Sequence, residues 1–479
     1  MANLFYNYIS FAANIVLPLA YVPYIYQLFG PDINGRIAWI TSIAFYFSLF
    51  AGMSVSPYAA RKLAAIREDT VRYNYEARAF LSFAFFNSLI VYSIFMIFAL
   101  VIAPHQLLEY SLIGLNILTV GVNVDYVYQA REEFKSLAMR GIILKILTVV
   151  LVFVCIKKPN DMHLYLGLSA VAILSVNVYY AFRAKVFPNL HKYLRQFVKI
   201  FNELKTFFIM SLTMTFYSRI HLVILGAITP PNESGQYSFT QKFGQLALSL
   251  IQILLTTLSP SMVTNYAQSP EQYLKKVNRG FRANLLIVGF VWSVFFSCSV
   301  QIENTFGKEQ YEPSALLLAV YSFILLFSGI SNYIATLQML VQKRESEMLV
   351  VALLASLFSV PLNFILSPRL GALGAIISYL CAELLILCIM VYKNLRSGFA
   401  LSWKLAFVAK SVVFPAISVI VLSKIIPEIG WGFWNLLAKA LVLSIVWIFA
   451  IFMINIDVVF RKNATQNGFK SFLFELLER

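Results

Sequence analysis

The stretch FFIMSLTMTFYSRIHLVILGAITPPNESGQYSFTQKFGQLALSLIQILLTTLS, residues 207–259, decides the fold of this chain. It consists of two apolar segments joined by a polar turn at Thr229–Gly235, and each is long enough to cross the roughly 30 Å hydrocarbon core of a bilayer. Arg219, His221 and Lys242 interrupt this apolar sequence. A charge at bilayer depth costs roughly 2.5–3.5 kcal/mol, so it usually faces a partner or a water-filled cavity. We therefore expect a membrane-embedded hairpin that carries part of a functional site.

The turn of this hairpin repeats a segment near the start of the chain. PNESGQYSF (231–239) and PDINGRIAW (31–39) share the proline, a central glycine and a final aromatic residue, and they lie 200 residues apart. Ser-Pro dipeptides at 56–57 and 259–260 extend the similarity. Such a duplication in a hydrophobic chain is typical of transporters built from two halves around a central site.

Composition supports a polytopic membrane protein. The chain has 479 residues, of which 60% are hydrophobic and 13% charged, with a mean hydropathy of +0.75. We predict an all-α protein with about 14 transmembrane helices, comprising two parallel six-helix repeats and two extra C-terminal helices. The four cysteines lie in apolar stretches, so we expect neither a disulfide nor a metal site from them. The predicted spans begin near residues 5, 37, 79, 108, 137, 163, 206, 236, 283, 314, 346, 370, 404 and 433.

The predicted domain order follows from these spans. An N-lobe of helices 1–6 (1–182) is followed by an amphipathic linker (183–205), a C-lobe of helices 7–12 (206–392), helices 13–14 (393–455) and a tail (456–479). Basic residues set the orientation, because 27 of the 38 Lys and Arg fall in loops on one side and six on the other. We expect both termini and the linker to be cytoplasmic. The net charge of +16 is then mostly loop bias, and no nucleic-acid partner is needed to explain it.

Several motifs, taken in order, resemble a known family. They are Leu17-Pro18 to Gly30-Pro31, the segment Asp125-Tyr-Val-Tyr-Gln-Ala-Arg-Glu-Glu-Phe-Lys135, Ile224-Leu-Gly226, Phe306-Gly307 with Tyr311, and Gly371-Ala-Leu-Gly-Ala375 with Glu383. At this spacing the chain resembles the bacterial O-antigen or polysaccharide repeat-unit flippases (Wzx-type) of the multidrug/oligosaccharidyl-lipid/polysaccharide (MOP) exporter superfamily. The resemblance covers about residues 10–395.

The sequence also departs from its apparent relatives. Where they often carry an acid before the Ile-Leu-Gly segment, this chain has His221 beside Arg219, so the role of that acid does not transfer. The first span has no arginine, unlike the flippases for lipid-linked peptidoglycan precursors, which argues against that substrate.

The resemblance implies a multi-pass protein of the bacterial inner (plasma) membrane that flips an undecaprenyl-pyrophosphate-linked oligosaccharide from the cytoplasmic to the periplasmic leaflet by alternating access. A polysaccharide polymerase and chain-length machinery are further expected partners, besides the lipid bilayer. Two alternatives stay open. One is a cation-coupled exporter of drugs or small solutes from the same superfamily, and the other is a membrane glycosyltransferase or polymerase.

Intramembrane charges are the candidate site residues. An arginine at mid-membrane offers a fixed charge and a donor fork to a pyrophosphate, or it pairs with an acid to hold helices together. Lys242 and Lys145 can contact the same head group or extend to water at the membrane surface. His221 diverges from Arg219 by about 200° on a helix, so the two cannot share a face. The predicted substrate-binding residues are thus Arg219, Lys242 and Lys145.

Three further titratable residues are candidates for coupling or ion pairing. His221 could couple proton movement to transport, although we favour a hydrogen-bonded buried imidazole. Glu383 and Asp125 are proton or cation sites or partners of basic residues, and we favour partnering for Asp125. No phosphate-binding loop for ATP and no HExxH metal motif is present, so we expect a transporter without catalytic residues, metal or cofactor.

Overall fold

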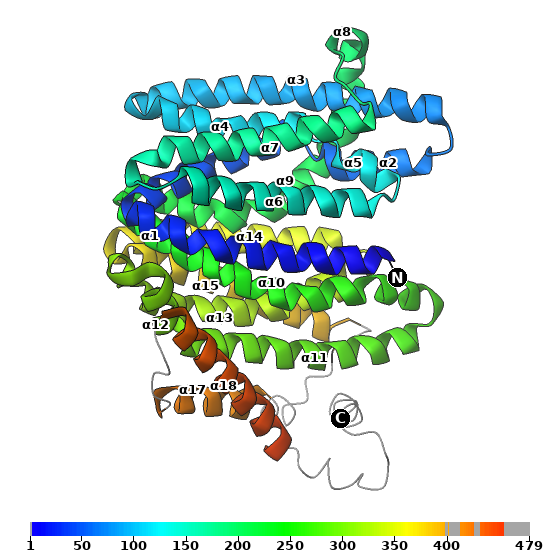
Figure 1. Ribbon diagram of the computed structural model, residues 1–479. Helices are drawn as coiled ribbons and strands as arrows, with labels where there is room; N and C mark the ends of the chain where they lie inside the picture. The colour runs from blue at the N-terminus through cyan, green and yellow to red at the C-terminus, as the bar shows by residue number, and fades with distance from the viewer. Residues whose placement is uncertain (1, 398–400, 402–411, 426–431, 455–479) are drawn as a thin grey trace. The chain divides into compact units, whose positions relative to one another are not determined.

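The computed structural model describes residues 2–397, 401, 412–425 and 432–454, and each regular element in these ranges is helical (Figure 1). The chain forms two compact units. The first comprises Met1–Gly226 with Pro230–Gly235, and the second comprises Ala227–Thr229 and the chain from Gln236 onward.

The first unit is built mostly from long apolar helices with short helices at their ends. Its elements are α1 (Ala2–Gly52), α2 (Val55–Ala65), α3 (Thr70–Ile102), η1 (Pro104–Gln106), α4 (Leu107–Gly121), α5 (Asp125–Ala130), α6 (Phe134–Cys155), η2 (Pro159–Asp161), α7 (Met162–Ala184), α8 (Leu190–Tyr193), η3 (Leu194–Gln196) and α9 (Phe197–Ile228), whose last two residues belong to the second unit.

The second unit has the same character and includes two π-helical turns, η4 and η6. Its elements are α10 (Pro231–Gln268), whose first turn belongs to the first unit, α11 (Pro270–Ser297), α12 (Ser299–Ile302), η4 (Glu303–Gly307), η5 (Lys308–Tyr311), α13 (Ser314–Ile334), η6 (Ala335–Met339), α14 (Glu345–Leu370), α15 (Ala372–Leu395), α17 (Phe414–Ile425) and α18 (Gly432–Ile454).

Eleven helices in the described ranges are long and apolar enough to cross a membrane, fewer than the fourteen predicted spans. One reason is that α1 runs through two predicted spans without a break in its helical assignment. Two further helices are not among the eleven, because their apolar stretches within the described residues are shorter, Arg219–Ile228 in α9 and Phe414–Ile425 in α17. Residues 402–411, where the thirteenth span was predicted to begin, and the predicted tail 456–479 lie outside the described residues.

The bend in α1 lies at Gly30, which has φ 68° and ψ 177°. A side chain at this position would be strained, because positive φ brings Cβ against the backbone in L-residues. Pro31 follows at once and cannot donate a helical hydrogen bond. The two residues therefore separate the first and second predicted spans without an intervening loop.

The two units repeat local contacts at the predicted offset of 200 residues. The side chain of Asp69 caps α3 by accepting a hydrogen bond from the backbone N–H of Arg72 at 3.0 Å. Ser269 caps α11 in the same way, accepting from the N–H of Gln272 at 3.4 Å. Both side chains satisfy one of the free donors at a helix start.

Buried tyrosines provide a second repeated contact. In each unit, a tyrosine near the start of a long helix donates a hydrogen bond to a backbone carbonyl of a later segment. A second tyrosine, close to that carbonyl in sequence, donates a hydrogen bond back to a backbone carbonyl of the long helix. In the first unit these are Tyr73 to the carbonyl of Val127 (2.9 Å) and Tyr126 to that of Ala77 (2.8 Å). In the second they are Tyr273 to Leu337 (2.9 Å) and Tyr333 to Val277 (2.7 Å). These matching pairs support the internal duplication.

The two duplicated turns also interlock within the first unit. A Cβ added at Gly35 would lie 1.8 Å from the carbonyl oxygen of Pro231, and one added at Gly235 would lie 2.0 Å from that of Pro31. Each glycine thus lets the proline backbone of the other copy approach closely. We call these four residues the glycine interlock.

The predicted linker 183–205 is helical over most of its length. Arg183 still belongs to α7, α8 and η3 follow, and α9 begins at Phe197. The division into compact units falls later, around residues 226–236. The reason is that α9 packs on the first unit, for example through the indole N–H of Trp39, which donates to the carbonyl of Val223 at 3.0 Å.

Candidate functional site

A cavity of about 300 Å³ opens in the first unit where α1 gives way to α2. Met53 (φ 40°) and Ser54 (φ 57°) interrupt the helix there. Irregular backbone at membrane depth is tolerated where it is covered by protein or lines a cavity. Hydroxyl and amide side chains gather around this break, namely Ser48, Ser54, Ser56, Ser211 and Asn123.

Arg219 lies beside the aromatic wall of this cavity. Its guanidinium carbon sits 4.7 Å from the ring centre of Phe45, which lines the cavity. Arg219 is nine residues before the end of α9, which places it about 13 Å along the helix from that end. The side chain is half-buried. A permanent positive charge therefore lies partway along α9, held over an aromatic face.

His221 differs from Arg219 in exposure, as their spacing on the helix predicts. Its side chain is fully buried, with 0% of its surface exposed, whereas Arg219 is partly accessible. The phenol of Tyr46 donates a hydrogen bond to the carbonyl of Phe216 and helps to hold this part of α9 against α1. The helix thus turns its imidazole into the protein.

Asp125 forms an ion pair with Arg140 of α6, which was not among the residues predicted for the site. Asn123 donates to the Asp125 carboxylate at 3.1 Å, and Arg140 donates to the amide oxygen of Asn177. Asn177 in turn donates to the carbonyl of Thr119 at 3.0 Å. This polar network joins α4, α5, α6 and α7, and Asn123 connects it to the cavity wall. Arg140 could have been suspected from its position inside a long apolar helix, six residues after the start of α6.

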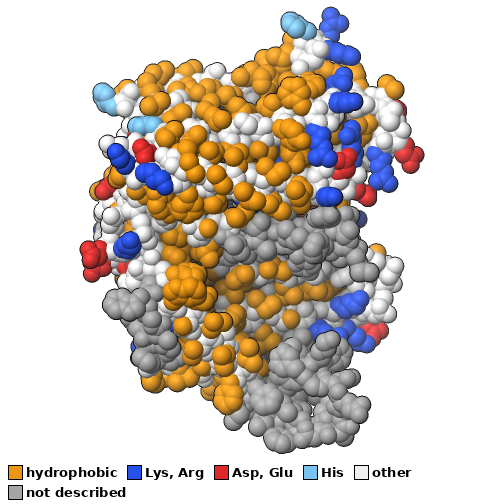
Figure 2. Space-filling view, viewed as in Figure 1, with side chains coloured by type: hydrophobic (Ala, Val, Ile, Leu, Met, Phe, Trp, Pro, Cys, Tyr) orange, Lys and Arg blue, Asp and Glu red, His pale blue; other side chains and the backbone are white. Residues whose placement is uncertain are grey.

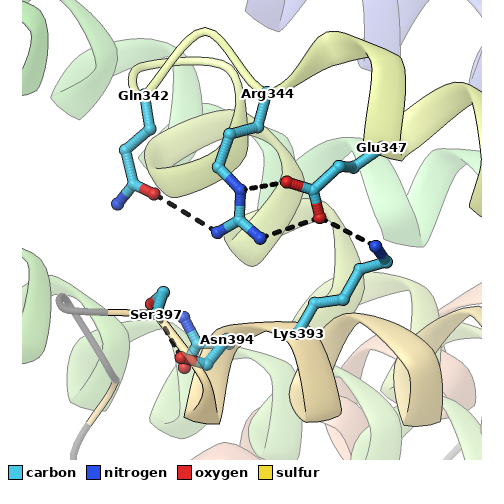
Figure 3. A network of polar contacts seen from close by, with 6 residues as sticks. All are labelled: Gln342, Arg344, Glu347, Lys393, Asn394 and Ser397. Carbon is cyan, nitrogen blue, oxygen red and sulfur yellow. Dashed lines mark hydrogen bonds and ion pairs between the residues drawn. The ribbon is translucent and has the colours of Figure 1, made fainter.

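The second unit has an ion-pair network between α14 and α15 (Figure 3). Arg344 donates through two nitrogens to the carboxylate of Glu347, at 2.6 and 2.8 Å. Lys393 reaches the same carboxylate at 2.8 Å, and Arg344 also donates to Gln342 at 3.4 Å. Lys393 therefore links α15 to α14, while Arg344 pairs with Glu347 at the start of α14 itself.

The remaining predicted residues are distributed over both units. Lys145 lies half-buried on α6 of the first unit, and Lys242 lies half-buried on α10 of the second. Glu383 on α15 is 3% exposed, and Ser328 and Tyr379 lie beside its carboxyl group. The structure thus places Arg219 against Phe45, one of the residues that line the cavity, and gives Asp125 a basic partner.

Glu303 is a titratable residue that sequence reasoning missed. It lies in η4, between the membrane-spanning helices, with 5% of its surface exposed. Burial raises the pKa of its carboxyl group to about 7, although the backbone N–H groups of Ala315 and Ser314 favour the charged form. Glutamates in short loops are usually solvated, so this burial could not be predicted from the sequence.

Similarity to known proteins agrees with the resemblance found in the sequence. The family model described as "Polysaccharide biosynthesis protein" matches residues 1–266. A protein of Escherichia coli (strain K12) named "Putative O-antigen transporter" is 21% identical over 405 residues, covering 81% of this chain and 95% of that protein.

Solved structures of the same fold exist. The inward closed conformation of the lipid II flippase MurJ has a TM-score of 0.74 at 11% identity, covering 96% of this chain and 99% of that one. An inward-facing multidrug resistance MATE family transporter of the MOP superfamily has a TM-score of 0.60 at 12% identity, covering 82% and 94%. At these identities the likeness concerns the fold. With a matched segment longer than half its length, the chain belongs to the polysaccharide biosynthesis protein family and has the MurJ and MATE transporter fold.

Proposed function

We propose that this protein flips an undecaprenyl-pyrophosphate-linked oligosaccharide, such as an O-antigen repeat unit, across the inner membrane. The observation that carries the proposal is the placement of Arg219, a permanent charge stacked on Phe45, which lines a largely apolar cavity that also carries hydroxyl and amide side chains. A pyrophosphate needs such a charge in a low-dielectric setting, and sugar hydroxyls pair with hydroxyl and amide side chains. The family membership and the name of the E. coli relative point to the same substrate class.

In the proposed cycle, Arg219 holds the head group while the lipid tail stays in the bilayer. Lys145 and Lys242 would add positive charge along the path, and His221 and Glu383 would respond to protons or contribute packing. The protein would present its substrate alternately to the two sides, with fourteen helices arranged as two parallel six-helix repeats, an N-lobe and a C-lobe, and both termini cytoplasmic. The helix break at Met53 and Ser54, before α2, would be a flexible point for this motion, and the glycine interlock would be a fixed point.

The cation-coupled exporter is a weaker alternative despite its shared fold. Such an exporter requires a deep acid in the first half that can exchange a cation. The deep first-half acid singled out from the sequence, Asp125, is engaged by Arg140 and Asn123. An acid already neutralised by arginine is a poor site for a transported cation.

Complementation tests the proposal. A host that lacks its own repeat-unit flippase would receive the wild type, Arg219→Ala or Arg219→Lys with the matching sugar pathway, and surface polysaccharide ladders would be scored at equal protein levels. We expect ladders from the wild type, none from the alanine variant and partial ladders from the lysine variant, which keeps the charge but not the donor fork.

Arg61→Ala is the matched control. Arg61 is also an arginine stacked on an aromatic ring, 5.3 Å from the centre of Phe207, but it is exposed and lies near the end of α2. This variant should leave the ladders normal. Normal ladders from Arg219→Ala would remove Arg219 from the substrate path, and absence of ladders from the wild type would refute the flippase function itself.

A further inference from the structure

The segment 190–205 packs one side against the first unit. Tyr193, Phe197, Ile200 and Leu204 are each at most 9% exposed and recur every three or four residues. The ring of Tyr193 lies 5.2 Å from that of Tyr75, and the ring of Phe197 lies 5.6 Å from that of Phe83. These contacts fix α8, η3 and the first turns of α9 on the side of α3, and Figure 1 shows α8 projecting beyond α3.

The opposite side of this segment is both apolar and basic. Leu194, Val198 and Phe201 are 53%, 72% and 47% exposed, again at three- or four-residue spacing. Arg195 and Lys199 lie four residues apart beside them and are exposed. An exposed apolar stripe flanked by basic residues is the pattern of a helix that lies in the membrane interface.

Helix length places this side at the membrane surface. α9 has 32 residues and so extends about 48 Å, whereas the hydrocarbon core is about 30 Å thick. About twelve residues must therefore lie outside the core. The sequence of α9 is apolar from residue 207 to its end, so the excess falls in its first turns, where Val198 and Phe201 are exposed.

The charge of the segment is not balanced by its own acids. Its single acidic residue, Glu203, forms an ion pair with Lys62 of α2 at 2.8 Å. Figure 2 shows Lys, Arg and His side chains gathered on this part of the first unit. The charge bias of the loops predicts the same side to be cytoplasmic, where the leaflet carries anionic lipids.

We propose that segment 190–205 is a binding surface for anionic phospholipids, in which Arg195 and Lys199 contact the head groups while Leu194, Val198 and Phe201 insert into the upper acyl region. Charge complementarity, exposed apolar area and helix length together favour a lipid surface over a protein partner. Docking on lipid would fix the start of α9, the helix that carries Arg219, relative to the bilayer.

Hydrogen exchange of the full-length protein in lipid nanodiscs tests this proposal. Peptides that cover 190–205 would be followed in discs of phosphatidylcholine alone and in discs with equal phosphatidylglycerol. Each Lys or Arg close to an anionic membrane surface strengthens membrane binding by about fivefold. A bound segment opens less often, so its amide hydrogens exchange more slowly. We expect exchange in this segment to slow about fivefold or more with phosphatidylglycerol, and the effect to fade at high salt.

Two variants make the test specific. Arg195→Gln with Lys199→Gln should remove the dependence on phosphatidylglycerol. Lys157→Gln with Lys158→Gln, an equal charge change at the exposed turn after α6, should retain it. Equal exchange in the two lipids for the wild type would overturn the proposal, as would an unchanged lipid effect in the Arg195 and Lys199 variant. Slowing that requires an added soluble protein instead of the lipid would assign the surface to a protein partner and also overturn it.

Discussion

Replacing Gly35 with alanine should destabilise the protein through the glycine interlock. The new Cβ would lie 1.8 Å from the carbonyl oxygen of Pro231, about 1.6 Å inside an ordinary contact of 3.4 Å. The obstructing atom belongs to the backbone, so no side-chain rotation relieves the overlap. Overpacking costs about 1–3 kcal/mol and occasionally more, and we expect about 3 kcal/mol here. For a unit of this size that corresponds to a melting temperature lower by roughly 6–12 °C.

The assay is thermal unfolding of the purified protein in detergent, with Gly141→Ala as the matched control. Gly141 lies in α6, and a Cβ there would meet nothing within 4 Å. That variant should be neutral or slightly stabilising, because alanine is favoured over glycine in a helix by up to about 1 kcal/mol.

Reciprocity provides a sharper criterion. The contact from Gly235 to Pro31 mirrors that from Gly35 to Pro231. If the two turns move apart to accommodate an alanine at one glycine, part of the overlap caused by an alanine at the other glycine is relieved as well. Gly35→Ala with Gly235→Ala should therefore cost less than the two single variants added together. A Gly35→Ala protein as stable as Gly141→Ala would refute the interlock, and strict additivity would refute the coupling between its two halves.

Three other features can be tested by unfolding measurements. Asp125→Asn or Arg140→Gln alone should cost about 2–4 kcal/mol, because each leaves a charge in a poorly solvated network, and the double variant should cost less than their sum. Tyr126→Phe and Tyr333→Phe should each lower the free energy of unfolding, measured by chemical denaturation, by about 1–2 kcal/mol, since each leaves a buried carbonyl without its hydrogen-bond donor. A near-zero cost for either variant would contradict the equivalence of the tyrosine pairs in the two units. The pKa of Glu303 is raised to about 7 from an ordinary value of 4.5, so the folded state binds a proton that the unfolded state has released between these values. Stability should accordingly fall by about 1–3 kcal/mol as pH rises from about 4.5 to 7 and then level off, and Glu303→Gln should flatten this part of the melting-temperature profile.

The distribution of apolar residues was enough to predict an all-helical membrane protein. Long apolar runs have few stable forms in lipid, because each backbone polar group must be satisfied within the chain. The repeat at Pro31 and Pro231 predicted a duplication, and the caps at Asp69 and Ser269 and the paired tyrosines, which recur in both units, are consistent with that prediction. The helix count was less well determined, because hydropathy cannot show that α1 continues through a bend at Gly30.

The candidate site was only partly accessible from the sequence. Intramembrane charge predicted Arg219 as a site residue, which stays a prediction, and helical periodicity separated it from His221, which is buried while Arg219 is partly exposed. The sequence did not reveal the basic partner of Asp125, because Arg140 lies on another helix and only packing brings the two together. The burial of Glu303 and the cavity at the α1–α2 break likewise depend on contacts between distant segments.

The sequence by itself was therefore enough to predict that this protein lies in a membrane, that it is helical and which charged residues fall in its apolar segments, because these properties depend on local composition and short-range periodicity. Only the tertiary structure decided which charges are paired, which glycines must remain glycine and where a cavity opens. Those properties are set by distances between segments about 200 residues apart, as at Gly35 and Pro231, and no local pattern contains them.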